Sequence, residues 1–366
     1  MLQISKTLAL SIALGTAAAP ALAQGEGTSS SAVTPKMLIN AGCANGAVYS
    51  IASDAHGNVA AAGYCGDVNG AHTGFVAKAD ADGTVQWTYR PDSTMRPANL
   101  AFDTNGNVLV AGQTTTGAAT VGAIIKIGLT GVPAWSRAVE AARGGNESCA
   151  NVATDADDTV FVSCSSSPAA SGSIVAYHAD GTAAWRTDAF ESAQALFTSS
   201  GTLYAASATN VRIVDRATGV VVSDARVSDA GSVRVGQDGK IYVKSDGGAM
   251  AVFDGALNAI GSVALNGALG AARSYDYFDV DARGNIYVLG AYYATTDLSG
   301  GGQYVAEFGP GGNPLWQYAA DPAASFGPRQ SPAALNQATG GSLVSVSAAG
   351  KSYVSTYLYL LEFPVR

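Results

Sequence analysis

Short stretches in which apolar and polar residues alternate recur along almost the whole chain, and each follows a tight turn. In residues 281–290, for example, a turn at Gly284 and Asn285 leads into the alternating run from Ile286 to Leu289. A period of two residues predicts a β-strand with one buried face, and Gly or Asn supplies the backbone conformation that a tight turn requires. Related turns occur at Gly57, Gly106, Asp158, Gly201, Gly239, Gly284 and, most weakly, Gly340. The pattern predicts a repeat with a period of about 40 to 50 residues.

A small residue follows six of these turns at a constant distance. The positions are Gly63, Gly112, Cys164, Ser207, Ser245 and Gly290. A small residue within a strand permits another backbone to approach closely. We expect the neighbouring repeat to make that approach.

All four tryptophans occupy one position of the repeat, shortly after a second turn in the unit. They are Trp87, Trp135, Trp185 and Trp316. A catalytic or cofactor-stacking role would not require four copies at one repeat position. We therefore predict a structural role, in which each indole ring docks between adjacent units.

Each unit has room for four short strands, two around the first turn and two around the second. Antiparallel units of this kind and period are typical of a β-propeller, whereas a parallel β-helix has shorter repeats. We predict an all-β fold, a seven-bladed β-propeller of four-stranded antiparallel blades, in a single domain over residues 37–366. The blades are expected near residues 43–90, 98–139, 149–188, 193–227, 231–265, 275–319 and 331–366.

The last unit lacks a recognisable fourth strand. Residues 357–363 match the third strand of a blade, as residues 304–308 do, and the sequence ends soon afterwards. The stretch 37–41, which precedes the first blade, can supply the missing strand. We expect the ring to be closed by this N-terminal strand, which removes an exposed strand edge.

Two motifs carry a resemblance to known propellers. The pattern Asp-x-x-Gly-Asn-x-Tyr-Val, complete from Asp281 to Val288, resembles the repeats of secreted bacterial propellers of the SBBP type. The spacing Gly-x-x-x-Trp, as from Gly181 to Trp185, is similar to the tryptophan-docking motif of the PQQ-like propellers, and the general form is BamB-like. The resemblance covers residues 37–366 but lies in structural positions. It implies the fold and says little about a ligand.

The first 23 residues have the composition of a secretory signal peptide. Lys6 provides a positive charge, residues 8–14 form a short apolar run, and residues 21–23 offer small side chains for cleavage. The apolar run is too short to cross a bilayer. We expect export to the periplasm or the extracellular space, a flexible N-terminal segment over residues 24–35, and no later membrane span.

The chain is acidic, with a formal net charge of −8, which argues against nucleic acid and anionic membranes as its main partners. Only 13% of residues are charged, and this composition suits many short strands and turns. We expect a monomer whose partner is an unknown protein or a small anionic or glycan ligand.

Four cysteines in an exported protein suggest two disulfides, for which three pairings exist. The repeat register favours Cys43 with Cys65 and Cys149 with Cys164, because each pair lies on neighbouring antiparallel strands of one blade. A metal site is the alternative. Cysteines on two non-adjacent blades cannot surround one ion, so we predict two disulfides and no metal.

Loops between blades, and loops after the second strand of a blade, lie on one face of a propeller, which we term the mouth face. Arg96, Arg273 and Arg329 occupy nearly the same register in these loops. If they converge, they could bind a carboxylate, a phosphate or an acidic sugar. The alternative is three separate surface charges that solvate the loops.

Aromatic residues near the same face could add stacking surfaces for a sugar or an aromatic ligand, although aromatic side chains also pack within ordinary blades. They are Tyr64, Tyr275, Tyr292 and Tyr293. His72 also lies in a loop of this face, but the sequence offers it no nucleophile and orienting acid for a catalytic triad.

Two carboxylates, Asp276 and Asp279, are close enough in sequence to suggest a pair for glycoside hydrolysis. The register argues for another role at Asp279. Arg234 holds the matching position in the preceding blade, where most other blades have Ala or Leu. Opposite charges at matching positions of neighbouring blades predict an inter-blade ion pair.

The sequence raises two candidate cofactors, calcium and a quinone. The acidic turns at residues 80–83 and 155–158 suggest calcium, but neither completes a calcium-binding loop, and Asp and Gly are also what tight turns require. The quinoprotein dehydrogenases that share the tryptophan motif carry an adjacent cysteine pair, which this chain lacks. We expect no cofactor, with calcium as the remaining possibility.

The function that these observations favour is an exported, non-catalytic β-propeller that binds a ligand or protein partner through its loop-rich face. The alternative is a hydrolase or lyase that acts on an anionic carbohydrate or related polymer at the channel mouth, using Arg96, Arg273 and Arg329. Catalytic residues are not identifiable from the sequence, so whether the protein is an enzyme stays open.

Overall fold

A computed structural model provides the structure of the protein. It describes residues 36–40, 45–66, 72–91, 94–139, 145–167, 171–190, 195–207, 209–227, 232–244, 249–265, 272–293, 302–319, 344–346, 352–356 and 359–363. The predicted signal peptide, residues 1–23, and the segment 24–35 lie outside these ranges. Among the described residues, no helix is long and apolar enough to cross a membrane.

The described chain folds into antiparallel four-stranded sheets, six of which each consist of four consecutive strands. Blade 1 contains β2 (Asn45–Ser53), β3 (Val59–Gly66), β4 (His72–Ala79) and β5 (Val85–Tyr89). Blade 2 contains β6 (Arg96–Phe102), β7 (Val108–Thr116), β8 (Ala119–Ile127) and β9 (Pro133–Val139). Blade 3 contains β10 (Asn146–Thr154), β11 (Val160–Ser167), β12 (Ser171–Tyr177) and β13 (Ala183–Phe190). Blade 4 contains β14 (Ala195–Ser199), β15 (Thr202–Ala206), β16 (Asn210–Val214) and β17 (Val221–Arg226). Blade 5 contains β18 (Ser232–Val235), β19 (Ile241–Lys244), β20 (Ala249–Phe253) and β21 (Ala259–Ala264). Blade 6 contains β22 (Ala272–Val280), β23 (Ile286–Tyr293), β24 (Gly302–Phe308) and β25 (Pro314–Ala319).

One further sheet combines strands from both ends of the sequence. Its order is β1-β28-β27-β26, with β1 (Lys36–Asn40), β26 (Val344–Val346), β27 (Ser352–Thr356) and β28 (Tyr359–Phe363). Strand β1 pairs antiparallel with β28, so the N-terminal strand takes the outermost position of this sheet.

The predicted count of seven blades is therefore corrected to six, since six blades are complete four-stranded units of continuous chain. The reason is that only six segments of the described chain contain four consecutive strands. The remaining sheet is a composite, and its side chains lie outside the described set. The all-β propeller architecture with four-stranded antiparallel blades holds.

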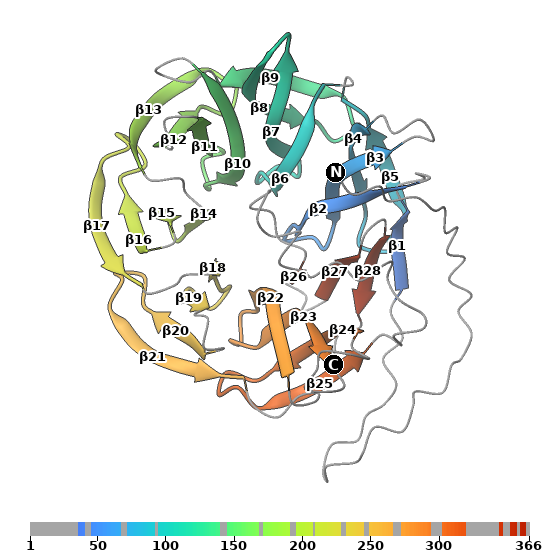
Figure 1. Cartoon of the computed structure of the whole chain (residues 1–366), viewed down its shortest axis with the longest axis vertical. Helices are drawn as coiled ribbons and strands as arrows, with labels where there is room; N and C mark the ends of the chain where they lie inside the picture. Colours follow the sequence, from blue (N-terminus) through green and yellow to red (C-terminus); the bar gives the residue numbers. More distant parts are fainter. Residues whose placement is uncertain are drawn as a thin grey trace.

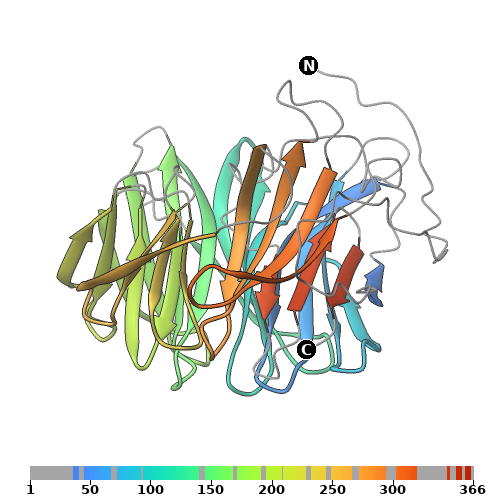
Figure 2. The ribbon, with the colours of Figure 1, turned by 90° about the horizontal axis from the view of Figure 1, so that it is seen from below.

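The first strand of every sheet of continuous chain lies innermost. Strands β2, β6, β10, β14, β18 and β22 contact one another in that order, and β26 contacts both β22 and β2. Figure 1 shows these strands around the centre and the fourth strands, such as β17 and β21, on the rim. Seen from the side in Figure 2, the strands run between two faces. The core lies between successive blades, as in the cluster that joins Leu109 and Ile124 of blade 2 to Val152 and Val162 of blade 3.

The repeated Asp-x-x-Gly-Asn sequence forms the turn after the innermost strand, on the face opposite the mouth. In blade 2, Asp103 Oδ1 accepts hydrogen bonds from the backbone N–H groups of Asn105 and Asn107, at 3.0 and 2.8 Å. The Asn107 side chain donates to Asp103 Oδ2 at 2.8 Å, and Gly106 has a φ of +78° that suits glycine. These bonds satisfy the turn backbone locally, which explains why the motif recurs.

Three of the four tryptophans, Trp87, Trp135 and Trp185, each pack against a glycine of the next blade. A Cβ atom added to Gly131 would lie 2.9 Å from Trp87 Cβ, and one added to Gly181 would lie 2.7 Å from Trp135 Cδ2. Trp135 Nε1 also donates a hydrogen bond to the Ala179 carbonyl at 3.0 Å. The indole rings thus dock one blade on the next, which is the role that their shared repeat position suggested.

Gly112, the small residue after the turn of blade 2, has a different neighbour from the one expected. A Cβ atom there would lie 2.2 Å from the carbonyl oxygen of Arg96, which belongs to the innermost strand of the same blade. The close approach of the neighbouring blade falls instead on the third strand, where a Cβ atom on Gly122 would lie 2.5 Å from Cys149 Sγ. The expectation of an approach by the neighbouring repeat at Gly112 was wrong, because the innermost strand bulges there.

Candidate binding site

A β-bulge recurs at one register of the innermost strands in four blades. In each case one residue is left unpaired between two ladder pairs, and the unpaired residues are Tyr49, Ala98, Ala150 and Asp276. Each is eight positions before the turn residue of its repeat. Bulges change the direction of a side chain and are frequent beside binding sites. The two short innermost strands β14 and β18 are paired without such a shift.

Blade 1 places a tyrosine at the bulge, and two further side chains gather around it. The ring of Tyr49 lies 5.2 Å from that of Tyr64 on β3, with 44° between the planes. Arg96, at the start of β6 in blade 2, is close enough to act electrostatically on Tyr49. We call Tyr49, Tyr64 and Arg96 the blade 1 mouth cluster. Tyr64 and Arg96 were predicted from the sequence.

The electrostatics of the cluster keep Tyr49 neutral. Burial raises the pKa of Tyr49, the charge of Tyr64 and a hydrogen bond with its side chain raise it further, and Arg96 opposes the shift. Tyr49 therefore offers a neutral hydroxyl. Arg96 itself is exposed and, among the described residues, its guanidinium makes no hydrogen bond or ion pair. The cluster thus presents a positive charge beside two phenol rings.

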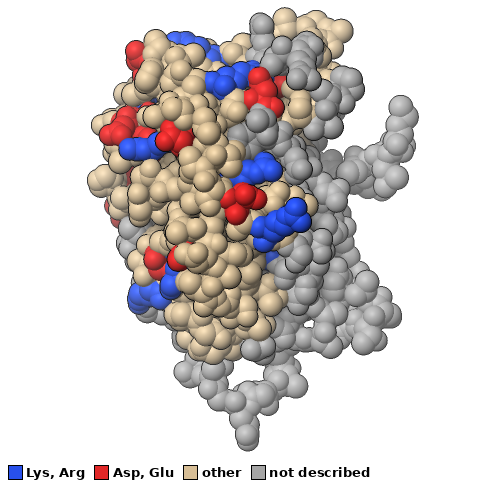
Figure 3. All heavy atoms as spheres, turned by 90° about the vertical axis from the view of Figure 1, so that its left-hand side faces the viewer, with Lys and Arg blue, Asp and Glu red and all other residues tan. Residues whose placement is uncertain are grey.

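A second arginine lies at the same edge of blade 1. Arg90 Nη1 donates to Cys65 Sγ at 3.1 Å, and Cys65 directly follows Tyr64 in the chain. Arg90 is exposed and adds positive charge to this part of an acidic protein. Figure 3 shows, by contrast, that Lys and Arg lie close to Asp and Glu on the side it presents, with no large area of one sign among its described residues.

Most of the other predicted ligand-binding residues are described only through their backbone. Arg273 pairs with Tyr292, Ala272 with Tyr293, and Tyr275 with Gly290, on strands β22 and β23 of blade 6. Their side chains lie outside the described set, as does that of His72 at the start of β4, and Arg329 lies outside the described residues altogether. The convergence of the three arginines therefore stays a prediction.

One predicted disulfide is present, between Cys149 and Cys164. The two residues are register partners on β10 and β11, directly before the bulge at Ala150, and both are buried. Cys65 is also disulfide-bonded, and its predicted partner Cys43 lies outside the described residues. No described cysteine is free.

Arg234 and Asp279 lie at matching positions of blades 5 and 6. Burial lowers the pKa of the Arg234 guanidinium, and the negative charge of Asp279 opposes this effect. Arg234 Nη1 also donates to the Val233 carbonyl at 2.8 Å, while Asp279 Oδ1 accepts from the Val280 N–H at 2.9 Å. The two opposite charges act on each other across the blade boundary.

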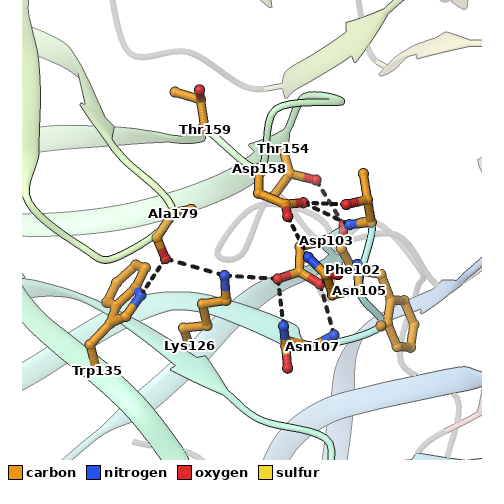
Figure 4. Close-up of polar contacts among 12 residues, drawn as sticks. Phe102, Asp103, Asn105, Asn107, Lys126, Trp135, Thr154, Asp158, Thr159 and Ala179 are labelled. Atoms are coloured by element: carbon orange, nitrogen blue, oxygen red, sulfur yellow. Dashed lines mark hydrogen bonds and ion pairs between the residues drawn. The ribbon is translucent and has the colours of Figure 1, made fainter.

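The face opposite the mouth contains buried charges that connect blades 2 and 3 (Figure 4). Lys126 Nζ lies 2.8 Å from Asp103 Oδ2 and donates to the Ala179 carbonyl at 3.2 Å. Burial alone would raise the pKa of Asp103, but hydrogen bonds from Lys126 and Asn107 outweigh it and hold that pKa below its usual value. These groups are occupied by one another, so they are structural.

Asp158 takes the place of the turn glycine in blade 3, with a φ of +58°. Its Oδ1 accepts hydrogen bonds from the backbone N–H and the hydroxyl of Thr104, both at 2.8 Å, and its Oδ2 accepts from Asn105 Nδ2 at 2.6 Å (Figure 4). Both partners belong to the turn of blade 2. This departure from the repeat therefore holds two blades together.

The acidic turns considered for calcium use their carboxylates on the protein itself. Asp80 Oδ1 accepts from the backbone N–H groups of Asp82 and Thr84, at 3.0 and 2.8 Å. Asp155 Oδ2 lies 2.8 Å from Arg216 Nη1 of blade 4. Within the described part of the chain, no three His, Cys, Asp or Glu side chains gather as metal ligands.

Two buried glutamates were missed by the sequence analysis. Glu147 accepts hydrogen bonds from the hydroxyls of Ser166 and Ser173, the latter at 3.0 Å, and lies 3.5 Å from Arg186 Nη2. Glu307 of blade 6 occupies the register position that Lys126 occupies in blade 2, and accepts a hydrogen bond from the Tyr287 hydroxyl at 2.9 Å. Only their place in the three-dimensional register distinguishes them from other acidic residues.

Comparisons with known proteins define the class of this chain through its fold. No protein-family model matches it, and no curated protein matches it. Among solved structures, streptogramin B lyase superposes with a TM-score of 0.57 at 11% identity, over 91% of this chain and 98% of that one. That likeness shows a shared fold.

Two further solved structures match with lower TM-scores. BamB from Moraxella catarrhalis has a TM-score of 0.47 at 15% identity, over 86% of this chain and 84% of that one. A protein of unknown function from Bacteroides caccae has a TM-score of 0.47 at 15% identity, over 67% and 90%. The sheet topology and the likeness to streptogramin B lyase show a β-propeller fold, and the SBBP repeat type stays a prediction.

Proposed function

We propose that this chain is an exported, non-catalytic β-propeller that binds a ligand or protein partner through its mouth face, at the blade 1 mouth cluster. The observation that carries the proposal is the exposed Arg96, close enough to act electrostatically on Tyr49, whose ring is paired with that of Tyr64. A charged group beside aromatic surface supplies both orientation and contact area for a ligand.

The buried carboxylates described above support a binding role over a catalytic one. Asp103, Glu147 and Asp155 are each matched by a cation or by hydroxyl donors of the protein. The streptogramin B lyase likeness extends to the fold, so the alternative of a hydrolase or lyase acting on an anionic carbohydrate remains an outcome for experiment to decide. The Cys149–Cys164 disulfide supports export, since disulfides persist in oxidising compartments.

The test is a binding screen with the mature protein against glycans, small organic acids and candidate exported proteins. Arg96→Gln removes the exposed charge, and Arg226→Gln is a matched control because Arg226 is also exposed but ends β17 on the rim of blade 4. The proposal expects a binder that is weakened by Arg96→Gln and not by Arg226→Gln. An affinity that Arg96→Gln leaves unchanged, or chemical conversion of the bound compound, would contradict the proposal.

Export has its own measurement. N-terminal sequencing of the protein recovered outside the cytoplasm should begin at Gln24, the residue after the predicted cleavage position. Recovery of the uncleaved chain in the cytoplasm with reduced cysteines would contradict export.

A further inference from the structure

The bulge register distinguishes blade 1 from its neighbours. Blades 2 and 3 carry Ala98 and Ala150 at the unpaired position and blade 6 carries Asp276, whereas blade 1 carries the large, polar-tipped Tyr49. A residue left out of the ladder is not constrained by cross-strand pairing, so alanine satisfies the fold there. The fold therefore does not require a tyrosine at this position.

The chemistry around Tyr49 narrows the class of ligand. Burial and Tyr64 both raise its pKa, so its hydroxyl is neutral, and beside its hydrogen bond with Tyr64 it can still accept a hydrogen bond from a ligand hydroxyl. The two phenol rings, 5.2 Å apart and tilted by 44°, offer apolar surface edged with hydroxyl groups. A sugar ring has the same mixture of C–H faces and hydroxyls.

The positive charge of Arg96 narrows the class of ligand further. Arg96 is exposed and close enough to act electrostatically on Tyr49, and a guanidinium pairs best with a planar carboxylate, which it can bind through two parallel hydrogen bonds. Arg90 lies next to Tyr64, where its Nη1 donates to Cys65 Sγ at 3.1 Å. A neutral sugar would leave the charge of Arg96 unused, and a simple carboxylate would leave the two phenol rings unused.

We propose, on the basis of the binding role proposed above, that the blade 1 mouth cluster recognises the carboxylate-bearing ring of an acidic sugar, with Tyr49 as a specificity residue. Arg96 binds the carboxylate. Tyr64 contacts the ring, and Tyr49 contacts both the ring and one of its hydroxyls. The class of ligand is a uronic acid residue, free or within a polymer.

The experiment measures binding of short uronate oligomers, of galacturonate, glucuronate and mannuronate type, to the mature protein by calorimetry. Each acidic oligomer is paired with its methyl ester, which keeps the sugar and removes the charge. At least one acidic oligomer should bind, and its ester should bind about tenfold more weakly, as expected when a charged hydrogen bond is lost. Raising the salt concentration should weaken the binding of the acidic oligomer and leave the binding of the ester unchanged.

Variants locate the contacts. Arg96→Gln should weaken the acidic oligomer about tenfold and leave the ester unchanged, whereas Arg226→Gln should change neither. Tyr49→Phe keeps the ring and should weaken both forms about three- to fivefold by removing one neutral hydrogen bond. Circular dichroism and the melting temperature of each variant confirm that it is folded, and Phe and Gln are chosen to keep side-chain volume.

The outcomes separate this inference from the binding role itself. If a neutral sugar or a non-sugar acid binds and depends on Arg96, the binding role stands and the acidic-sugar class is overturned. If esters bind as tightly as acids, or Tyr49→Phe leaves both affinities unchanged, the assigned contacts are overturned. If no compound or exported protein binds in a manner that depends on Arg96, both proposals fail.

Discussion

Substituting Gly181 by Ala tests how much the tryptophan docking contributes to stability. Gly181 has a φ of +82°, and a Cβ atom there would lie 2.7 Å from Trp135 Cδ2 and 3.1 Å from Arg137 Nη2. A left-handed backbone costs a non-glycine residue about 1–2 kcal/mol, and forcing an extra methyl group into packed surroundings costs about 1–3 kcal/mol more. Gly181→Ala should therefore destabilise the protein by about 2–5 kcal/mol.

Gly201 provides a matched control for the backbone part of that cost. Its φ is +79°, and a Cβ atom there would meet nothing within 4 Å. Gly201→Ala should cost only the backbone strain, about 1–2 kcal/mol. Urea unfolding of both variants, compared at equal slope with the parent protein, measures the difference.

A second background isolates the indole ring. In a Trp135→Ala protein the two nearest atoms, both of the indole ring, are gone and only the flexible end of Arg137 remains close, so Gly181→Ala should then cost little more than Gly201→Ala does. Equal costs for Gly181→Ala and Gly201→Ala in the parent protein would refute the reasoning, since the docking contact would then exert no steric demand.

Three further perturbations follow from the structure. Burial and the charge of Asp281 raise the pKa of Glu307, although hydrogen bonds from Tyr287 and Trp316 oppose the shift, so folding favours the protonated form. As the pH rises from about 4.3 through the folded pKa, the parent protein should therefore lose stability relative to Glu307→Gln. A relative gain in melting temperature over that pH range would contradict this. Single replacements of Arg234 and Asp279 by Leu should together cost about 1–3 kcal/mol more than the double replacement in a double-mutant cycle, and simple additivity would reject their coupling. Asp158→Gly relieves the left-handed backbone but removes three hydrogen bonds to blade 2, so unfolding measurements should show a net loss of stability of about 1–3 kcal/mol, and a gain would show that the bonds contribute little.

Local turn chemistry made much of the fold predictable from the sequence. Asp103, Gly106 and Asn107 satisfy their own turn through contacts between near neighbours, so the motif is readable wherever it recurs. The spacing between such motifs then fixes the strand register. That register brought Cys149 opposite Cys164, where the structure has a disulfide.

The bulge was not predictable in the same way. An unpaired residue such as Tyr49 adds one position to the innermost strand without changing the turn that follows it, so the spacing between turns does not reveal it. One signal was present in the sequence: Tyr49 stands where Ala98 and Ala150 stand in the next two blades. Because the bulge was not predicted, the neighbour of Gly112 was predicted wrongly: the residue is small because the bulged strand of its own blade approaches it closely.

Contacts between blades were predictable only where the repeat itself carries them. The docking of Trp135 on Gly181 follows from two recurring positions, whereas the bonds from Asp158 to Thr104 and Asn105 depend on a single departure from the pattern. Nothing near Asp158 in the sequence indicates that its carboxylate reaches the preceding blade. Such contacts join residues about fifty positions apart, and only the ring brings them together.

Departures from the repeat fall into two physical groups, and the distinction indicates where function lies. At Asp158 and Glu147 the unusual polar atoms are occupied by other groups of the protein, so these departures adjust the packing of one blade on another. At Arg96 the charge remains in solvent, beside a tyrosine that the bulge does not require. Because the bulge itself accepts alanine and the charge of Arg96 lies in solvent, their arrangement is better explained by a ligand than by the ring.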